Sequence, residues 1–235
     1  MSRPRQLPLA LRYPPDQRLE TFVAAPAAAI AQLRALVAGD GEWLYLSGPA
    51  GVGKTHLALG GCAEAESSGR PAHYLPLRAW CGRGGEALPA PVPGGFHALD
   101  GIEALAGDRD AEVALFDFHN AARDVGAHVL YTARETPELL GLRLPDLRSR
   151  LGQCARIVLQ VPGDAERAEI LRLRAARRGL QFEDAAIDWL LRRVGRDLGS
   201  LTRLLDRLDR ESLAAQRRLT VPFLREVLGP DGAGA

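Results

Sequence analysis

Residues 48–56 read GPAGVGKTH, and this short stretch constrains the fold more than any other part of the chain. It fits the pattern G-x-x-x-x-G-K-[ST], and it lies between an apolar run at residues 42–47 and a helix-forming segment that begins at Lys54. In that context glycines let the backbone turn tightly, so that N–H groups point at phosphate oxygens near the positive end of the helix dipole. The sequence therefore predicts a phosphate-binding loop between a strand and a helix, rather than a chance match in a glycine-rich turn.

Lys54 is the only lysine of the chain, and the other 29 of the 30 basic residues are arginines. A compact ammonium on a flexible stem reaches the crowded space between β- and γ-phosphates, where a planar guanidinium fits less well. The Thr55 hydroxyl is of the type that binds Mg²⁺. We predict nucleotide contacts along the whole loop, from Gly48, Pro49, Ala50, Gly51, Val52, Gly53, Lys54, Thr55 and His56.

The pattern along the chain predicts an α/β fold followed by an all-helical part. Short apolar runs alternate with helical periodicity, including a helix at 113–126, which favours a five-stranded, mostly parallel sheet with helices on both faces. The runs lie at 42–47, 72–77, 96–100, 127–133 and 155–161, and helices alone are expected at 164–178, 184–194, 198–215 and 221–228. We therefore expect a proline-rich tail at 1–16, an α/β domain at 17–162, a small helical domain at 163–229 and a frayed end at 230–235.

Composition narrows the functional classes. The chain has 235 residues, of which 46% are hydrophobic and 25% charged, and a formal net charge of +1. These values are ordinary for a soluble globular protein, and they give no global positive field for nucleic acid. The three cysteines are far apart and odd in number, which favours a reducing cytoplasm over a disulfide framework. We expect neither a signal peptide nor a membrane span.

ATPases with a loop of this type usually carry a second acidic site, in which an apolar strand ends in an aspartate that is followed by another acid. In this chain the second of these two acids is missing. The apolar run at 96–100 ends in Asp100, which is placed to hold Mg²⁺ through water; its simpler interpretation is an acid that caps the next turn. The next residue is Gly101, which cannot activate water, and Glu103 can replace it only if the backbone turns unusually. We expect weak or no intrinsic hydrolysis.

Five stretches resemble the Hda family, the DnaA-like regulatory AAA+ proteins. They are GPAGVGKTH, ALDGIEALAGD, FDFHN, LPDLRSRL and LDRESLAAQRRLTVPFLREVL, and the resemblance extends over residues 6–229. It implies an AAA+ domain with a helical lid, and we expect the DNA-binding helix-turn-helix of DnaA to be absent, as it is in the family. The complete phosphate loop departs from the family, which tolerates degenerate loops, and this departure leaves room for some hydrolysis.

The resemblance also implies a mechanism and partners. Members of the family bind ADP, dock on the DNA-loaded sliding clamp and present an arginine to ATP held by DnaA, which then hydrolyses it. In the tail, Gln6, Leu7 and Leu9 resemble the Q-L-x-L peptide that binds the clamp. The partners implied are DnaA and the polymerase III sliding clamp, with a homodimer possible and no sequence-specific contact to DNA.

Three further residues take roles from the resemblance, each with a simpler alternative. Arg150 matches the arginine finger that acts on the neighbour's ATP, and its alternative is a surface pair with Asp146. Arg196 matches the lid arginine that reaches the bound phosphates, and its alternative is an ordinary residue at a helix start, paired with Asp197 or a neighbour. Thr132 matches the polar sensor at the end of a strand, a position where threonine also occurs for its β-propensity alone.

Rival functions remain open at this point. An autonomous AAA+ ATPase or helicase loader would show rapid turnover without DnaA, and Gly101 argues against it. A DNA-binding module conflicts with the net charge of +1 and with the missing helix-turn-helix. A P-loop kinase fits the all-helical end less well than an AAA+ protein does.

Overall fold

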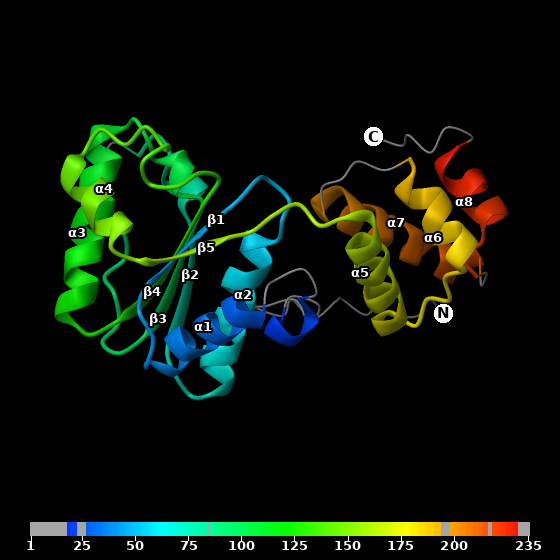
Figure 1. Ribbon diagram of the computed structural model, residues 1–235, viewed down its shortest axis with the longest axis horizontal. Helices are drawn as coiled ribbons and strands as arrows, with labels where there is room; N and C mark the ends of the chain where they lie inside the picture. The colour runs from blue at the N-terminus through cyan, green and yellow to red at the C-terminus, as the bar shows by residue number, and fades with distance from the viewer. Residues whose placement is uncertain (1–17, 23–26, 84, 194–197, 216–217, 230–235) are drawn as a thin grey trace, which may run out of the picture.

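The computed structural model describes residues 18–22, 27–83, 85–193, 198–215 and 218–229. It contains a part built around a β-sheet and a part built of helices alone, joined by the segment that follows the last strand (Figure 1). The first part carries the phosphate-binding loop. In the described residues no helix combines the length and the apolarity that a bilayer crossing requires.

The sheet has five strands in the order β2-β3-β4-β1-β5, and all four pairings are parallel. The strands are β1 (Leu44–Ser47), β2 (Ala72–Pro76), β3 (Phe96–Asp100), β4 (His128–Ala133) and β5 (Ala155–Val158). The central strands β1, β3 and β4 are almost entirely buried, as expected for a parallel sheet covered on both faces. The predicted α/β fold with a five-stranded parallel sheet is confirmed.

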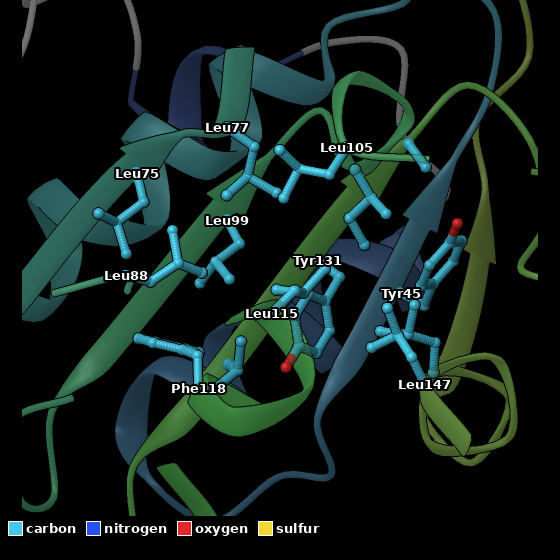
Figure 2. Close-up of a cluster of buried hydrophobic side chains, with 14 of the residues drawn as sticks. Tyr45, Leu75, Leu77, Leu88, Leu99, Leu105, Leu115, Phe118, Tyr131 and Leu147 are labelled. Atoms are coloured by element: carbon cyan, nitrogen blue, oxygen red, sulfur yellow. The ribbon is translucent and has the colours of Figure 1, made fainter. Parts of the chain in front are cut away.

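Helices cover both faces of the sheet (Figure 1). The helices α1 (Ala27–Ala38) and α2 (Lys54–Ser67) pack on one face, and α3 (Arg109–Asp124) and α4 (Pro145–Gly152) pack on the other. Figure 2 shows the core under α3, where the buried rings of Tyr131 and Phe118 lie among leucines from β2, β3 and α3. Three short 3₁₀ helices, η1 (Leu19–Thr21), η2 (Leu77–Trp80) and η3 (Ile102–Ala104), complete this part.

Several boundaries differ from the sequence-based expectation, and the structure gives a cause for two of the larger differences. The helix expected at 113–126 begins at Arg109, because the Asp108 carboxylate accepts hydrogen bonds from the N–H groups of Asp110 and Ala111 at 3.1 and 3.2 Å and so caps an earlier turn. The last strand, expected to extend to residue 161, ends at Val158, because β1, its neighbour in the sheet, ends at Ser47, which pairs with Val158.

The helices α5 (Asp164–Arg177), α6 (Asp184–Leu191), α7 (Leu198–Ala215) and α8 (Val221–Leu228) form the helical part. They share a hydrophobic core of their own, in which Leu171, Leu190, Leu205 and Leu224 are fully buried. Apolar residues recur every three or four positions along these helices, and this spacing buries one face of each helix against the others. The helical part therefore has the core that an independent packing unit requires.

Candidate functional site

The loop that follows β1 lies at the carboxyl edge of the sheet, between β1 and the start of α2. At Gly53 the backbone has a φ of 101°, and a Cβ atom there would lie 2.4 Å from Cε2 of Phe22. Both facts require glycine, because a side chain strains the backbone and overlaps the ring. Helix α2 begins at the next residue, and the first N–H groups of a helix have no carbonyl partner within it, so they are available to an anion at the loop.

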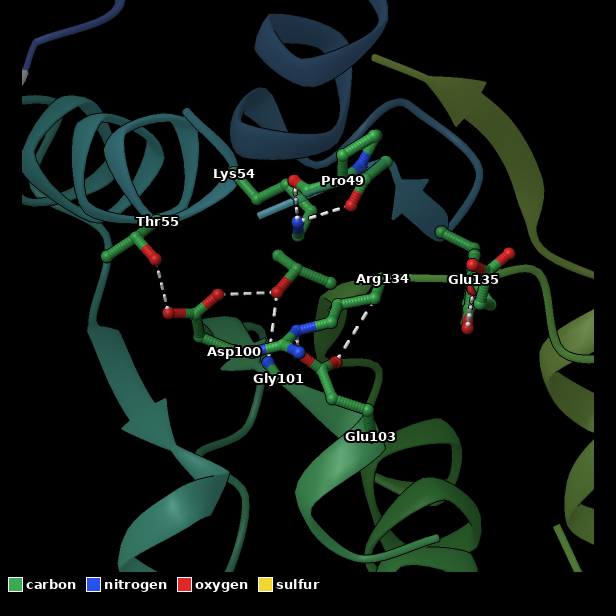
Figure 3. A network of polar contacts seen from close by, with 11 residues as sticks. Pro49, Lys54, Thr55, Asp100, Gly101, Glu103, Arg134 and Glu135 are labelled. Carbon is green, nitrogen blue, oxygen red and sulfur yellow. Dashed lines mark hydrogen bonds and ion pairs between the residues drawn. The ribbon is translucent and has the colours of Figure 1, made fainter. Parts of the chain in front are cut away.

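Lys54 is the cation of the loop, and its side chain folds over it. Its ammonium donates hydrogen bonds to the carbonyl oxygens of Gly48 and Pro49, the second at 2.8 Å (Figure 3). Burial lowers the pKa of Lys54, and the carboxylates of Glu103 and Asp100 oppose that shift. The lone lysine therefore lies where the loop needs a positive charge, and both carboxylates are within electrostatic range of it.

Asp100, at the end of β3, accepts three hydroxyl hydrogen bonds, of which Figure 3 shows the one from Thr55. Thr55 and Tyr74 donate to Oδ2 at 2.7 and 2.8 Å, and Thr132 donates to Oδ1. The register places Asp100 beside Thr132 on β4, so these two predicted residues meet directly. Asp100 is thus not a cap of its own turn: its carboxylate lies next to the Thr55 hydroxyl.

No motif in the sequence points to Tyr74, the third of these hydroxyls. It lies on β2, and it reaches Asp100 because β2 is the neighbour of β3 in the sheet. Burial and the adjacent carboxylate raise the pKa of Tyr74, so its hydroxyl stays protonated and remains a donor. Only the strand order, which the sequence does not contain, brings this tyrosine to the site.

The backbone turn after Asp100 brings Glu103 back to the site. Gly101 has a φ of 88°, its N–H donates to the carbonyl oxygen of Thr132 at 3.1 Å, and η3 follows at once. Oε2 of Glu103 accepts from the N–H of Arg134 at 3.2 Å, and Oε1 lies 3.3 Å from Nε of the same arginine. The unusual turn on which a role for Glu103 depends is therefore present, and the carboxylate is paired with an arginine.

These residues fit a magnesium nucleotide. The Thr55 hydroxyl and the Asp100 carboxylate are oxygen donors of the type that Mg²⁺ prefers, and they lie within hydrogen-bond distance of each other. No cluster of three His, Cys, Asp or Glu side chains that would hold a metal by itself occurs in the described ranges. This is the usual situation for Mg²⁺ bound through one or two protein groups and the phosphates of a nucleotide.

His56 is the second residue after Lys54, but its ring contacts η1 and its flanking residues instead of the loop. Its Nε2 is 3.0 Å from the Thr21 hydroxyl and 2.9 Å from the carbonyl oxygen of Arg18, and Phe22 packs edge-on at 5.1 Å. The ring therefore holds η1 against α2. A contact to phosphate at this position falls to the backbone N–H.

Helix α4 carries Arg148 and Arg150 on the α3 side of the sheet (Figure 1). The Arg150 charge contributes to the lowered pKa of His119 on α3, whereas the groups that shift the pKa of Lys54 are Glu103, Asp100 and Arg134. Among the ion pairs of the described residues none involves Arg148, Arg150 or Asp146, so the pairing of Arg150 with Asp146 is not formed. Leu147 and Leu151 of α4 are buried, and they fix the helix against the core.

Four of the predicted site residues lie outside the described residues. These are Arg196, expected to reach the phosphates from the helical part, and the tail residues Gln6, Leu7 and Leu9. Their roles stay predictions.

Comparison with known proteins finds a family match for the helical part and structural matches that extend over both parts of the chain. Residues 164–228 match the family "Hda, lid domain". Domain III of the replication initiation protein DnaA from Thermotoga maritima is similar over 95% of this chain and 100% of its own, with a TM-score of 0.77 and 18% identity.

Two other solved structures agree on the fold. AMPPCP-bound DnaA from Aquifex aeolicus matches 88% of this chain and 70% of its own, with a TM-score of 0.66 and 19% identity. A mutant of RuvB from Thermotoga maritima matches 93% of this chain and 75% of its own, with a TM-score of 0.69 and 19% identity. These likenesses establish the AAA+ fold, and the lid match connects the chain with Hda.

Proposed function

We propose that this chain, whose residues 164–228 match the Hda lid family and whose fold is similar to that of DnaA domain III, is a nucleotide-binding regulator that stimulates ATP hydrolysis by DnaA. It does so while docked through Gln6, Leu7 and Leu9 on the DNA-loaded sliding clamp, in the cytoplasm, and it thereby prevents over-initiation of chromosome replication. Its own ligand is ADP or ATP with Mg²⁺, and it makes no sequence-specific contact to DNA. Residues 17–162 form the nucleotide-binding domain and residues 163–229 the lid.

The observation that carries this proposal is the contrast between Lys54 and Arg150. Lys54 is hydrogen-bonded to the carbonyl oxygens of the loop, and the Asp100 carboxylate is hydrogen-bonded to nearby hydroxyls, so both have partners within the chain. Arg150 has no ion pair among the described side chains, and it lies on the α3 side of the sheet, whereas α2 with Lys54 packs on the opposite face. A cation so placed is suited to an anion on another molecule.

Each residue contributes one element of the proposed mechanism. The loop N–H groups and Lys54 hold the phosphates of the chain's own nucleotide, while Thr55 and Asp100 hold Mg²⁺. Arg196 of the lid would contact the same phosphates, so a bound nucleotide would link the lid to the loop. Arg150 places a guanidinium beside the phosphates on DnaA, where it stabilises the charge of the transition state; such a finger contributes about 10³–10⁵ in rate.

The direct experiment measures hydrolysis of ATP preloaded on DnaA. This protein is added with and without DNA-loaded clamp, and we expect fast hydrolysis only when both are present. A triple variant, Gln6→Ala with Leu7→Ala and Leu9→Ala, should lose the clamp in a pulldown and lose the stimulation with it. Equal DnaA turnover with and without this protein would refute the proposal.

A second candidate is an autonomous AAA+ ATPase of the DnaA or helicase-loader type. The position of Glu103 at the site favours it, because a carboxylate near the phosphates is the group that activates water. Its pairing with Arg134 opposes it. Turnover without DnaA at the level of ordinary P-loop ATPases, lost in Asp100→Ala, would select this candidate.

A further inference from the structure

The ion pair of Arg134 and Glu103 stands at the mouth of the phosphate loop. Ser47 pairs with Ala133, so Arg134 is the residue opposite Gly48, the first residue of the loop, and the N–H of Gly48 donates to the carbonyl oxygen of Ala133 at 3.3 Å. Arg134 follows β4 at the same carboxyl edge of the sheet where Asp100 ends β3, and Figure 3 shows its side chain together with Lys54 and Asp100. The arginine therefore follows the strand that lies between the phosphate loop and Asp100.

Arg134 keeps most of its binding capacity. Its guanidinium is paired with Glu103 only through Nε, and its side chain is 53% exposed. In the described part of the chain the guanidinium makes no hydrogen bond to another residue, while the Arg134 N–H also binds Glu103. The two terminal nitrogens are thus free to form the two-pronged contact that a guanidinium makes with a phosphate.

Glu103 opposes that contact in two ways. It holds the guanidinium through Nε, and it adds a negative charge close to Lys54, where the phosphates of a nucleotide are expected. The Glu103 side chain is 28% exposed, so solvent screens this charge less than it screens Arg134. An additional phosphate therefore meets attraction from Arg134 and repulsion from Glu103 at the same place.

We infer that Arg134 binds the third phosphate of a nucleoside triphosphate, that Glu103 competes with that phosphate for the arginine, and that this pair sets how strongly the site distinguishes a triphosphate from a diphosphate. The inference rests on the proposed nucleotide binding and deepens it. A diphosphate ends short of the pair and depends on the loop and Lys54. The preference is then a property of two side chains that lie outside the loop motif.

The test is a set of binding measurements without DnaA, clamp or turnover. Isothermal titration calorimetry gives the Kd of ADP and of the non-hydrolysable analogue AMPPCP at fixed Mg²⁺ and salt for each variant. Glu103→Gln frees the arginine and removes the opposing charge, so the affinity for AMPPCP relative to ADP should rise about tenfold. Arg134→Ala leaves Glu103 unpaired beside the phosphates, so the same ratio should fall about tenfold.

The double variant and a matched ion pair complete the design. Glu103→Gln has no arginine to release when Arg134→Ala is present, so the ratio of the double variant should stay below that of the wild type. Arg156 and Glu138 form an exposed pair at β5, and Arg156→Ala and Glu138→Gln should leave the ratio unchanged. Melting temperatures of all variants verify that they are folded.

The outcomes separate this inference from the proposed function. Wild-type protein that binds ADP and AMPPCP, with ratios within twofold of wild type in both single variants, overturns the inference and leaves nucleotide binding intact. A ratio that falls in Glu103→Gln overturns the competition. Wild-type protein that binds neither nucleotide overturns the proposed nucleotide binding and this inference with it.

Discussion

Two charged regions of the α/β part are organised in opposite ways. Around the phosphate loop, each charge has a partner within the chain: Lys54 on two carbonyl oxygens, Asp100 on three hydroxyls, and Glu103 on Arg134. On α4, Arg148 and Arg150 have no ion pair within the described part of the molecule. The first region is organised before any ligand arrives and a ligand must replace internal bonds, whereas the second offers charge to something outside.

The largest expected effect tests the second region. Arg150→Ala should lower the stimulation of DnaA hydrolysis by about 10³ or more, because a guanidinium at a transferring phosphate contributes that much to the rate. Single-turnover hydrolysis of DnaA-bound ATP measures it. Arg148→Ala, on the same helix, is the matched control and should keep most of the stimulation. ADP binding by both variants should equal that of the wild type. Full stimulation by Arg150→Ala would refute the assignment of Arg150 as the arginine finger.

Lowering the pH tests the stability of the buried core on which both charged regions rest. Burial is the main cause that lowers the pKa of His97 and of His119 to about 4, and the neighbours His73 for the first, and Arg123 and Arg150 for the second, act in the same direction. Nε2 of His97 already accepts the Val92 N–H at 3.1 Å, and Nε2 of His119 is buried without a partner in the described structure. Protonation of either ring in the folded state is therefore unfavourable.

Proton binding in the unfolded and folded states decides whether acid stabilises or destabilises the protein. The unfolded chain binds protons at these histidines near pH 6.5 and the folded chain only near pH 4, so stability is lost as the pH falls between these values. From pH 8 to pH 5 each histidine should lower the free energy of unfolding by about 2 kcal/mol. Urea unfolding at a series of pH values measures it. His119→Gln should remove the share of one histidine, about 2 kcal/mol, from this loss; an unchanged slope would contradict the assignment.

Replacement of Lys54 tests the first region directly. Lys54→Ala should weaken ADP binding by about 2–3 kcal/mol, or about 30- to 150-fold, because a charge-assisted contact to phosphate is lost. Lys54→Arg should recover less than half of this loss, since the wider head does not fit the space next to the Gly48 and Pro49 carbonyls. Calorimetric titration with ADP gives both values. Binding by Lys54→Arg at the wild-type level would show that charge alone is required.

The smallest expected effect concerns Tyr74. Tyr74→Phe removes one of the three hydroxyls on Asp100 and should lower the free energy of unfolding by about 1 kcal/mol. Tyr45→Phe is the matched control, because that buried hydroxyl donates to the carbonyl oxygen of Glu135 and not to Asp100. Both variants should unfold somewhat earlier in urea, and only Tyr74→Phe should also weaken the dependence of ADP binding on Mg²⁺. An identical dependence in both would show that Tyr74 has no part in positioning Asp100.

The sequence predicted the features that depend on local pattern. Apolar runs located all five strands, and the loop motif located the meeting of β1 and α2, because each rests on neighbours a few residues apart. The four helices of the lid followed from helical periodicity in the same way. The start of α3 was missed because the Asp108 cap acts before the apolar pattern begins.

The features of the site that could not be predicted from the sequence depend on contacts between distant segments. Tyr74 joins Asp100 only because β2 lies beside β3, and no spacing in the sequence reveals strand order. Glu103 meets Arg134 only because Gly101 takes a positive φ and directs η3 toward the end of β4. A turn of that kind changes the meaning of a residue that a motif alone would pass over.

The isolation of Lys54 has a practical consequence. Since no other lysine occurs, the loop holds the sole ε-amine of the chain, 9% exposed and with a lowered pKa that favours its nucleophilic neutral form. An acylating reagent selective for ε-amines would mark one position and no other. Protection of that position from the reagent would report how much of a sample carries a ligand in its phosphate loop.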